Sequence, residues 1–192
     1  MERITLMESF LKKMDKNSIA VEIGTDEGNF SEKILNANEN ITLYCIDPYI
    51  SYDDYKDAIN TKTGDELFKK TYNKLKSKYG ERVKFIRNFS SDKSTIENIP
   101  PIDFLYIDGN HSYKYVLEDL ENYYPKVKNG GIIMGDDAVD LDESKRDCNG
   151  DVLINWSYNC YGYYGVVNAF NNFIKLNKIQ GSLIGNQFVI KK

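Results

Sequence analysis

The sequence predicts an α/β fold with a doubly wound sheet of seven strands, mostly parallel, with helices on both faces and a C-terminal antiparallel hairpin. Short apolar or β-branched runs alternate along the chain with segments of helical periodicity. Near-continuous apolar strands are typical of parallel sheets, because their crossover helices cover both faces. The expected parallel strands are residues 19–23, 41–46, 83–86, 104–107 and 132–134, and the expected hairpin turns at Gly185 and Asn186.

Segments of helical periodicity lie before and between these strands. Apolar residues from Met7 to Met14 recur at helical spacing, which predicts an amphipathic N-terminal helix within residues 1–16. The other expected helices are residues 30–35, 66–79, 95–98, 113–124 and 166–176.

A polar and aromatic stretch, residues 138–165, separates the fifth expected strand from the last helix. It is longer than an ordinary connection, which indicates a substrate loop or lid. Its Tyr and Trp side chains could stack on a sugar ring or another flat substrate. Equally, they could pack the lid against the body or form a dimer contact.

Length and charge limit the classes of function. A chain of 192 residues is long enough for one domain and short for two, so we expect a single domain over residues 1–192. With 25 basic and 29 acidic side chains, the chain lacks the broad positive field that favours nucleic acid. It also lacks an apolar run long enough for a bilayer and a cleavable apolar leader. We therefore expect a cytoplasmic protein that binds neither nucleic acid nor membrane.

The first expected strand runs into a glycine loop with the sequence VEIGTDEG. Gly24 and Gly28 frame a turn that lets the backbone approach a ligand, and the next helix begins with free N–H groups. A dinucleotide fingerprint would read GxGxxG, whereas this loop reads GxxxG with Glu22 before it. An acid there suits a ligand with an ammonium group or hydroxyls better than a pyrophosphate.

Asp47 ends the second expected strand in the sequence LYCIDPY. A carboxylate at this place can accept two hydrogen bonds from a ribose diol, which indicates a nucleoside ligand. The alternative is that Asp47 and Pro48 only form the turn that ends the strand. The residues alone leave both interpretations open.

Taken together, EIGTDEG, CIDPY and the run from FLYIDGNHSY to GGIIMGDD resemble the class I S-adenosylmethionine-dependent methyltransferases, which have a Rossmann-like sheet. The resemblance is greatest to the small O-methyltransferases that include metal-dependent sugar methyltransferases. It implies S-adenosylmethionine as the methyl donor. The residues that it places around this cofactor are Glu22, Gly24, Thr25, Asp26, Gly28, Asp47, Phe89, Ser90, Ser91 and Asp108. Asp47 would hold the ribose, and the NFSSD segment would contact the adenine. Many methyltransferases have a second glycine where this chain has Asp26.

Three aspartates follow neighbouring strands. Asp108 ends the fourth expected strand, and Asp136 and Asp137 end the fifth, so all three should meet at the carboxyl edge of the sheet. A hard divalent cation would relieve the repulsion between them. The resemblance also implies metal ligands at these positions, so we expect magnesium there. The alternative is that Asp108 forms a tight turn and the other two cap a loop.

His111 is the only histidine of the chain, three residues after Asp108. A hydroxyl is a poor nucleophile at neutral pH, so its methylation needs a base, a metal, or both. Similar macrolide-sugar methyltransferases use a histidine at this spacing, and other sugar methyltransferases use an aspartate where this chain has Asn110. The alternative is an exposed residue beside a helix whose N-cap is Ser112.

These patterns predict an S-adenosylmethionine-dependent O-methyltransferase that acts on a sugar or glycan precursor, with a divalent metal and with Asp108 and His111 as catalytic residues. Two alternatives stay open. One is a catechol- or phenol-type O-methyltransferase, which usually has a lysine base, and the other is a non-catalytic nucleoside-binding protein. The expected partners are a carbohydrate or another small molecule, and a second copy of the chain in a homodimer.

Overall fold

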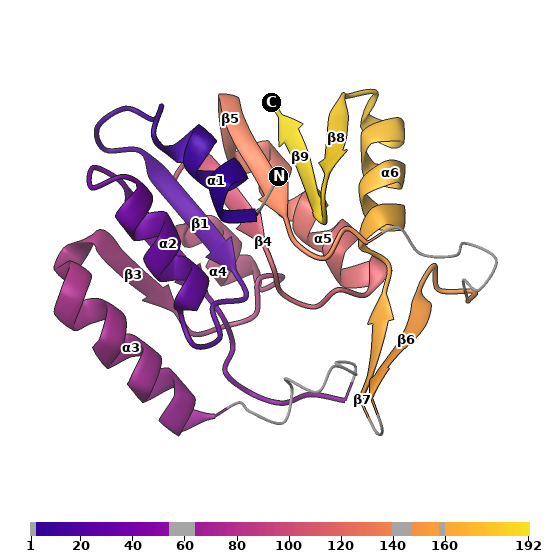
Figure 1. Ribbon diagram of the computed structural model, residues 1–192, viewed down its shortest axis with the longest axis horizontal. Helices are drawn as coiled ribbons and strands as arrows, with labels where there is room; N and C mark the ends of the chain where they lie inside the picture. Colours follow the sequence, from indigo (N-terminus) through magenta and orange to yellow (C-terminus); the bar gives the residue numbers. More distant parts are fainter. Residues whose placement is uncertain (1–2, 54–63, 140–146, 158–159) are drawn as a thin grey trace.

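A seven-stranded sheet with the strand order β3-β2-β1-β4-β5-β9-β8 forms the centre of the structure (Figure 1). The structure is a computed structural model that describes residues 3–53, 64–139, 147–157 and 160–192. The parallel strands are β1 (Ile19–Ile23), β2 (Thr42–Ile46), β3 (Val83–Ile86), β4 (Ile102–Ile107) and β5 (Val127–Gly135). The antiparallel strands are β8 (Gly181–Ile184) and β9 (Gln187–Lys191), which pair with each other and, through β9, with β5. The predicted fold class is confirmed.

Helices cover both faces of this sheet. One face carries α1 (Arg3–Leu11), α2 (Asn29–Ala37) and α3 (Asp65–Tyr79). The other carries α4 (Lys93–Asn98), α5 (Tyr113–Tyr123) and α6 (Val166–Asn177). Two short 3-10 helices, η2 (Gly80–Arg82) and η3 (Tyr124–Lys126), lead into β3 and β5.

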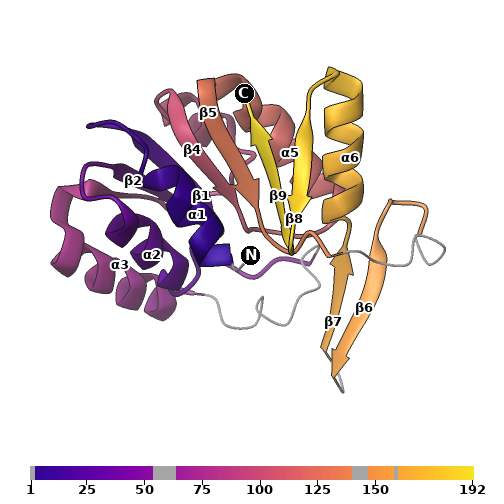
Figure 2. The ribbon, with the colours of Figure 1, turned by 45° about the horizontal axis from the view of Figure 1, so that its top comes forward.

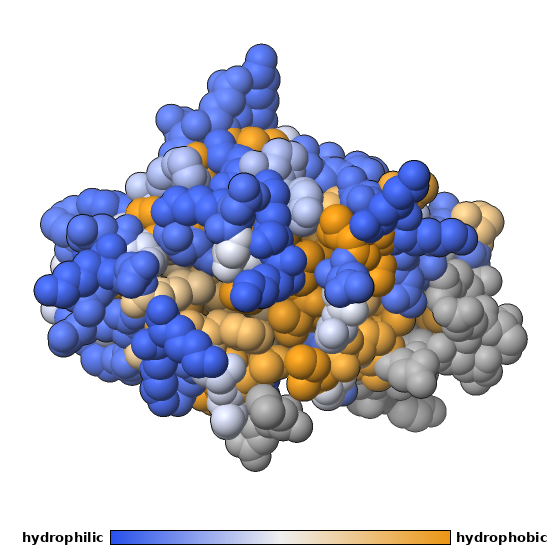
Figure 3. Space-filling model, turned by 90° about the horizontal axis from the view of Figure 1, so that it is seen from above, coloured by the Kyte–Doolittle hydropathy of each residue, from blue (hydrophilic) through white to orange (hydrophobic). Residues whose placement is uncertain are grey.

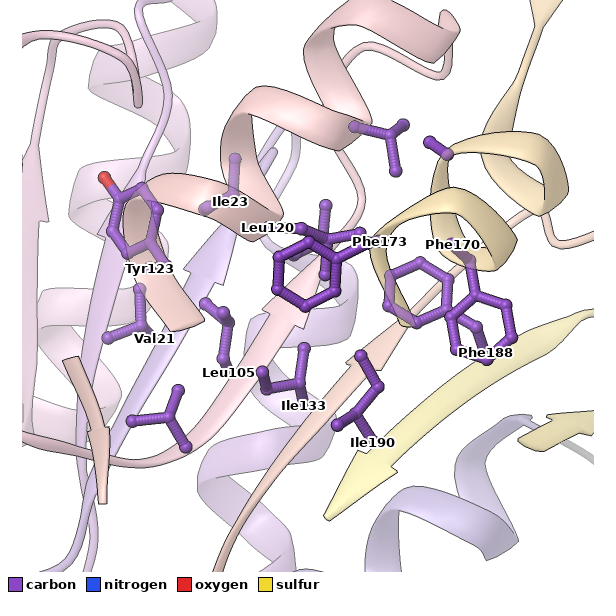
Figure 4. Packing of buried hydrophobic residues seen from close by; sticks show 14 of the residues in the cluster. Val21, Ile23, Leu105, Leu120, Tyr123, Ile133, Phe170, Phe173, Phe188 and Ile190 are labelled. Carbon is purple, nitrogen blue, oxygen red and sulfur yellow. The ribbon is translucent and has the colours of Figure 1, made fainter. Parts of the chain in front are cut away.

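Each face of the sheet has its own hydrophobic core, because successive side chains of a strand point to opposite faces. In β4, Leu105 packs toward α5 and α6, whereas Tyr106 packs toward α1 and α2. Figure 4 shows the first core, where Leu120 and Phe173 lie over Leu105 and Ile133. Both cores hold the carboxyl ends of β1 and β4 side by side, and these ends position the site described below.

The N-terminal helix is shorter than the predicted range 1–16. It ends at Leu11, and the side-chain amide of Asn38 donates hydrogen bonds to the carbonyls of Leu11 (2.9 Å) and Met14 (3.2 Å). These bonds satisfy carbonyl groups that a longer helix would have bonded internally. The apolar residues Leu6 and Met7 of this helix are buried in the core of the same chain. The predicted homodimer stays a prediction.

The segment predicted as a loop or lid contains a two-stranded antiparallel hairpin. Its strands are β6 (Val152–Ser157) and β7 (Cys160–Tyr164), and they form a sheet separate from the central one. Figure 2 shows this hairpin projecting from the body below α6. Its β-branched and aromatic residues favour strands, a signal that the interpretation as a loop did not use. Residues 140–146 and the aromatic side chains between Leu153 and Tyr163 lie outside the described part, so their predicted stacking on a substrate stays a prediction.

The surface mixes polar and apolar side chains. Seen from above in Figure 3, hydrophilic side chains surround a central apolar band. Among the helices of the described ranges, none is long and apolar enough to cross a membrane.

Candidate active site

Two adjoining pockets open at the carboxyl ends of β1 and β4, where the order of strands along the sheet reverses. Open α/β sheets bind their ligands at this switch point. The pockets enclose about 870 and about 820 Å³, including solvent at their mouths. Gly24, Asp26 and Asp108 line both of them. Ligands in the two pockets would therefore meet at these residues, as the transfer of a group between them requires.

The first pocket, which we call the donor pocket, brings together most of the residues predicted to bind the cofactor. The predicted residues that line it are Gly24, Asp26, Asp47, Phe89, Ser90, Ser91 and Asp108. Glu22 and Thr25 instead line the second pocket, which we call the acceptor pocket. Gly28 lines neither pocket. It turns with a φ of 70° against α3, where a Cβ atom would lie 2.8 Å from a methyl group of Leu75.

The carboxylate of Asp47 braces the glycine loop. Its Oδ2 accepts hydrogen bonds from the backbone N–H groups of Thr25 (3.1 Å) and Asp26 (3.0 Å), and its Oδ1 accepts one from Tyr49 (2.8 Å). Burial raises the pKa of Asp47, and the hydrogen bonds from the backbone oppose this rise. The hydrogen bond from the backbone N–H of Tyr49 closes a turn at the end of β2, as expected if Asp47 and Pro48 end the strand. The brace between β2 and the loop was not predicted, and the contact with ribose stays a prediction.

Gly24 directly follows β1 and packs against the backbone of Asp108, which directly follows β4. It has a φ of +90°, and a Cβ atom at this position would lie 2.0 Å from the carbonyl oxygen of Asp108. Only glycine fits such a close approach without moving one of the two strand ends. This contact fixes the glycine loop relative to Asp108, so it determines where the two pockets meet.

Asp119 is a residue of the donor pocket that the sequence analysis missed. It lies on the buried side of α5, and desolvation raises the pKa of its carboxyl group to about 7, although a hydrogen bond from Ser90 lowers it. The hydroxyl of Tyr123 donates to the backbone carbonyl of Ser90 (2.9 Å), which fixes the same segment. The sequence does contain a signal for this residue: Asp119 falls at helical spacing with the apolar residues Val116, Leu120 and Tyr123, which predicts that its side chain is on the buried face of the helix.

Glu22 lies almost fully buried at the end of β1. Desolvation raises the pKa of its carboxyl group to about 8, and a hydrogen bond from the hydroxyl of Ser31 opposes this rise. At neutral pH the side chain is therefore mostly protonated. Glu22 was predicted to contact the cofactor, but it lines the acceptor pocket and not the donor pocket, so this contact stays a prediction.

Replacing Glu22 by glutamine is expected to flatten the dependence of stability on pH. In the folded chain Glu22 keeps its proton up to about pH 8, whereas the ordinary value for the unfolded chain is 4.5. The stability of the parent therefore falls as pH rises through this window, because the unfolded state releases a proton that the folded state holds. Urea unfolding of both proteins between about pH 5 and pH 8 measures the difference. Parallel pH profiles for parent and variant would contradict the assignment.

Of the three aspartates predicted as metal ligands, Asp108 and Asp137 line the acceptor pocket together with His111, and Arg3 links Asp136 to Asp108. The Nε2 atom of His111 lies 3.3 Å from Oδ1 of Asp108, and its Nδ1 atom lies 3.6 Å from Oδ2 of Asp137. Asp137 has a φ of 51°, a left-handed backbone conformation that aspartate adopts more readily than most residues. The sequence therefore identified a cluster that the fold does bring together.

The same cluster contains Arg3, which was not predicted. The guanidinium group of Arg3 forms an ion pair with Oδ2 of Asp136, and its Nη1 atom lies 3.5 Å from Oδ2 of Asp108. The other carboxylate oxygen of Asp136 accepts a hydrogen bond from the side-chain amide of Gln187. No sequence motif points to Arg3, because it belongs to the N-terminal helix and not to a strand end.

This arrangement does not fit the predicted magnesium ion. Magnesium needs oxygen ligands at about 2.0–2.1 Å in octahedral geometry. Here both carboxylate oxygens of Asp136 are engaged by Arg3 and Gln187, and Arg3 also faces Asp108. Within the described ranges, no three His, Cys, Asp or Glu residues form a group that could hold a metal ion. The prediction did not consider that a cation from another part of the chain could relieve the repulsion between the carboxylates. Arg3 is such a cation.

His111 lies mostly buried between the cluster and the hairpin. Its side chain is 12% exposed, and its ring stacks on Tyr164 of β7 with centroids 5.1 Å apart. The backbone N–H of Gly165 donates to the carbonyl of His111 (2.8 Å). Ser112 is the N-cap of α5, as the alternative interpretation held, but His111 is not an exposed neighbour of it. The base of the hairpin therefore fixes the imidazole.

A doubly wound sheet with a glycine loop and two pockets that meet at the switch point is typical of α/β proteins that bind nucleotide-type ligands there. Residues 21–138 match the family model described as Methyltransferase domain. The chain belongs to this methyltransferase family. Its fold is that of the class I S-adenosylmethionine-dependent methyltransferases, so S-adenosylmethionine is the expected cofactor.

Known proteins similar to this chain differ in how far the likeness extends. Protein R132 of Acanthamoeba polyphaga mimivirus, whose own function is uncharacterised, is 30% identical over 140 residues. These residues are 70% of this chain and 58% of that protein, so the chain spans well under two thirds of its relative. The solved structure of the O-methyltransferase NovP has a TM-score of 0.63 at 17% identity, over 99% of this chain and 79% of NovP. The solved structure of CalS11, a TDP-rhamnose 3'-O-methyltransferase of calicheamicin biosynthesis, has a TM-score of 0.59 at 13% identity, over 98% of this chain and 76% of CalS11. At these identities the solved structures show the fold alone.

Proposed function

We propose that the protein is an S-adenosylmethionine-dependent O-methyltransferase whose acceptor is a hydroxyl of a sugar or glycan precursor. The observation that carries this proposal is the position of His111, which lines the acceptor pocket with a carboxylate facing each ring nitrogen. CalS11, which is named a TDP-rhamnose 3'-O-methyltransferase, has the same fold, so this fold can accommodate a sugar acceptor.

The donor occupies the donor pocket in this proposal. The glycine loop and the end of β4 hold its methionine part, with Gly24 and Asp108 at the junction of the pockets. Phe89 and Ser90 also line this pocket, and the adenine would lie against them. The donor is already activated as a sulfonium ion, so most of the catalytic effect comes from holding the two reactants in line.

The chemical step moves one methyl group and one proton. A lone pair of the acceptor oxygen attacks the methyl carbon, the carbon–sulfur bond breaks, and its electron pair remains on sulfur to give S-adenosylhomocysteine. The hydroxyl proton passes to the imidazole of His111. Asp108 and Asp137 then stabilise the positive charge on the ring, because they face its two nitrogen atoms.

The predicted metal has no step in this mechanism, because Arg3 and Gln187 engage the carboxylates that would hold it. A divalent ion at this position would first have to displace the guanidinium group of Arg3 from Asp136. Arg3 already supplies one positive charge to this cluster.

The acceptor pocket favours an aliphatic hydroxyl over a phenol. Catechol-type enzymes usually have a lysine base, and no lysine is among the described residues that line this pocket. His111 can accept a proton near neutral pH, which an aliphatic hydroxyl requires and an easily ionised phenol does not. The second alternative, a non-catalytic nucleoside-binding protein, leaves the arrangement of His111 unexplained.

A screen of acceptors with methyl-labelled donor tests the proposal. Nucleotide sugars, free glycans and catechols are each incubated with the protein, once with magnesium and once with EDTA. We expect label in a carbohydrate fraction. Label in catechols alone would overturn the acceptor class, and donor binding without transfer to any acceptor would support the non-catalytic alternative.

A further inference from the structure

Arg3 lies in a slot built from two separate parts of the chain. Its guanidinium carbon lies 4.4 Å from the centroid of the Phe30 ring, on α2, and 6.0 Å from that of Tyr106, on β4. These two rings stack on each other with centroids 4.2 Å apart. The guanidinium group therefore has an aromatic platform and the carboxylates of Asp108 and Asp136 as partners, which is more than an exposed ion pair offers.

The N-terminal helix fixes Arg3 in this slot. The side chains of Leu6, Met7 and Leu11 are at most 3% exposed, and they pack into the same core as Phe30 and Tyr106. Figure 1 shows the first turn of α1 close to the carboxyl end of β5, which Asp136 follows directly in the sequence. Arg3 therefore reaches the acidic cluster only when α1 is packed against the sheet.

We propose that Arg3 is the resident cation of the acidic cluster, in the place where a divalent metal would otherwise bind. Methyl transfer then depends on the docked N-terminal helix and not on added metal. A guanidinium group suits this role because it stays charged at all physiological pH values and can serve two carboxylates at once. Its planar face packs on the Phe30 ring, which a hydrated metal ion would not do.

Binding of Mn²⁺, measured by electron paramagnetic resonance, tests the proposal without any acceptor. The parent protein is expected to leave Mn²⁺ free at millimolar concentration, and Arg3→Ala is expected to gain one site. The site should disappear again in the double variant Arg3→Ala with Asp136→Asn. A parent site that Asp136→Asn abolishes would overturn the proposal, and so would an Arg3→Ala variant that is folded and gains no site.

Arg87→Ala is the matched control. Arg87 also forms an ion pair, with Asp65 (2.6 Å), and also lies over an aromatic ring, that of Phe68 (4.9 Å), but it is not in the acidic cluster. Its loss is expected to create no Mn²⁺ site. A site in this variant would mean that Mn²⁺ binds wherever an arginine is removed, and it would overturn the specific role of Arg3.

Metal-free turnover rests on the proposed function, whereas Mn²⁺ binding can be measured whether or not an acceptor is found. With an acceptor from the screen, the parent is expected to keep its rate in EDTA. Arg3→Lys should retain part of the activity and still exclude Mn²⁺, because it keeps the charge. If the parent binds no Mn²⁺ and no acceptor is methylated, the proposed function fails while Arg3 remains the resident cation. A rate that requires Mg²⁺ would overturn the role of Arg3.

Discussion

The variant His111→Ala is expected to lower the rate of methyl transfer by about 10²–10⁴-fold, the usual contribution of a general base. The affinity for the donor should stay the same, because His111 lines the acceptor pocket and not the donor pocket. The reason for the loss is chemical: at neutral pH the acceptor hydroxyl keeps its proton unless a base removes it. Single-turnover rates with labelled donor, together with calorimetry of donor binding, measure the two effects separately.

Added imidazole separates a base from a residue that only shapes the pocket. It should restore part of the rate of His111→Ala, because it can enter the space that the side chain leaves. His111→Gln keeps the polar character and most of the size, but it cannot accept the proton, so it should be as slow as the alanine variant. A glutamine variant as fast as the parent would show that transfer needs no base at this position.

The sequence predicted the elements of the fold because their signals are local. Apolar runs marked β1 to β4 within two residues of their observed bounds. For β5 the apolar run showed only residues 132–134, because the strand begins with the polar and glycine residues 128–131. These residues lie at an irregularity in the pairing of β5 with β4, where Lys128 also forms an ion pair with Asp103 of β4 (2.8 Å), a contact between distant positions that no local pattern contains.

The candidate site was predictable to the same extent. Strand ends meet at one edge of a parallel sheet, so Asp108, Asp136 and His111 could be brought together from the sequence alone. What the sequence could not show is which groups compensate their charges. Arg3 reaches the cluster from a helix whose docking depends on the packing of Leu6 and Met7, and Gln187 reaches it from β9. The metal was predicted without these groups, and no group of residues that could hold one is found in the described part of the chain.

The variant Gly24→Ala is expected to destabilise the protein by about 2–4 kcal/mol and to abolish donor binding. The added Cβ atom would lie 2.0 Å from the carbonyl oxygen of Asp108 and 2.8 Å from the backbone nitrogen of Gly109. These are backbone atoms at the end of β4, so they cannot rotate away as a flexible side chain would. The ends of β1 and β4 must separate, and the two pockets meet at these ends.

Gly130→Ala separates this clash from the cost of the backbone conformation alone. Gly130 has a φ of +85°, close to the +90° of Gly24, but a Cβ atom there would meet nothing within 4 Å. Its replacement should cost only about 1–2 kcal/mol, the penalty of a left-handed conformation for an L-residue, and should leave donor binding intact. Urea unfolding gives both free energies and calorimetry gives donor binding. Equal destabilisation by the two variants would mean that the strand ends yield easily, and the contact between Gly24 and Asp108 would then not fix the junction of the pockets.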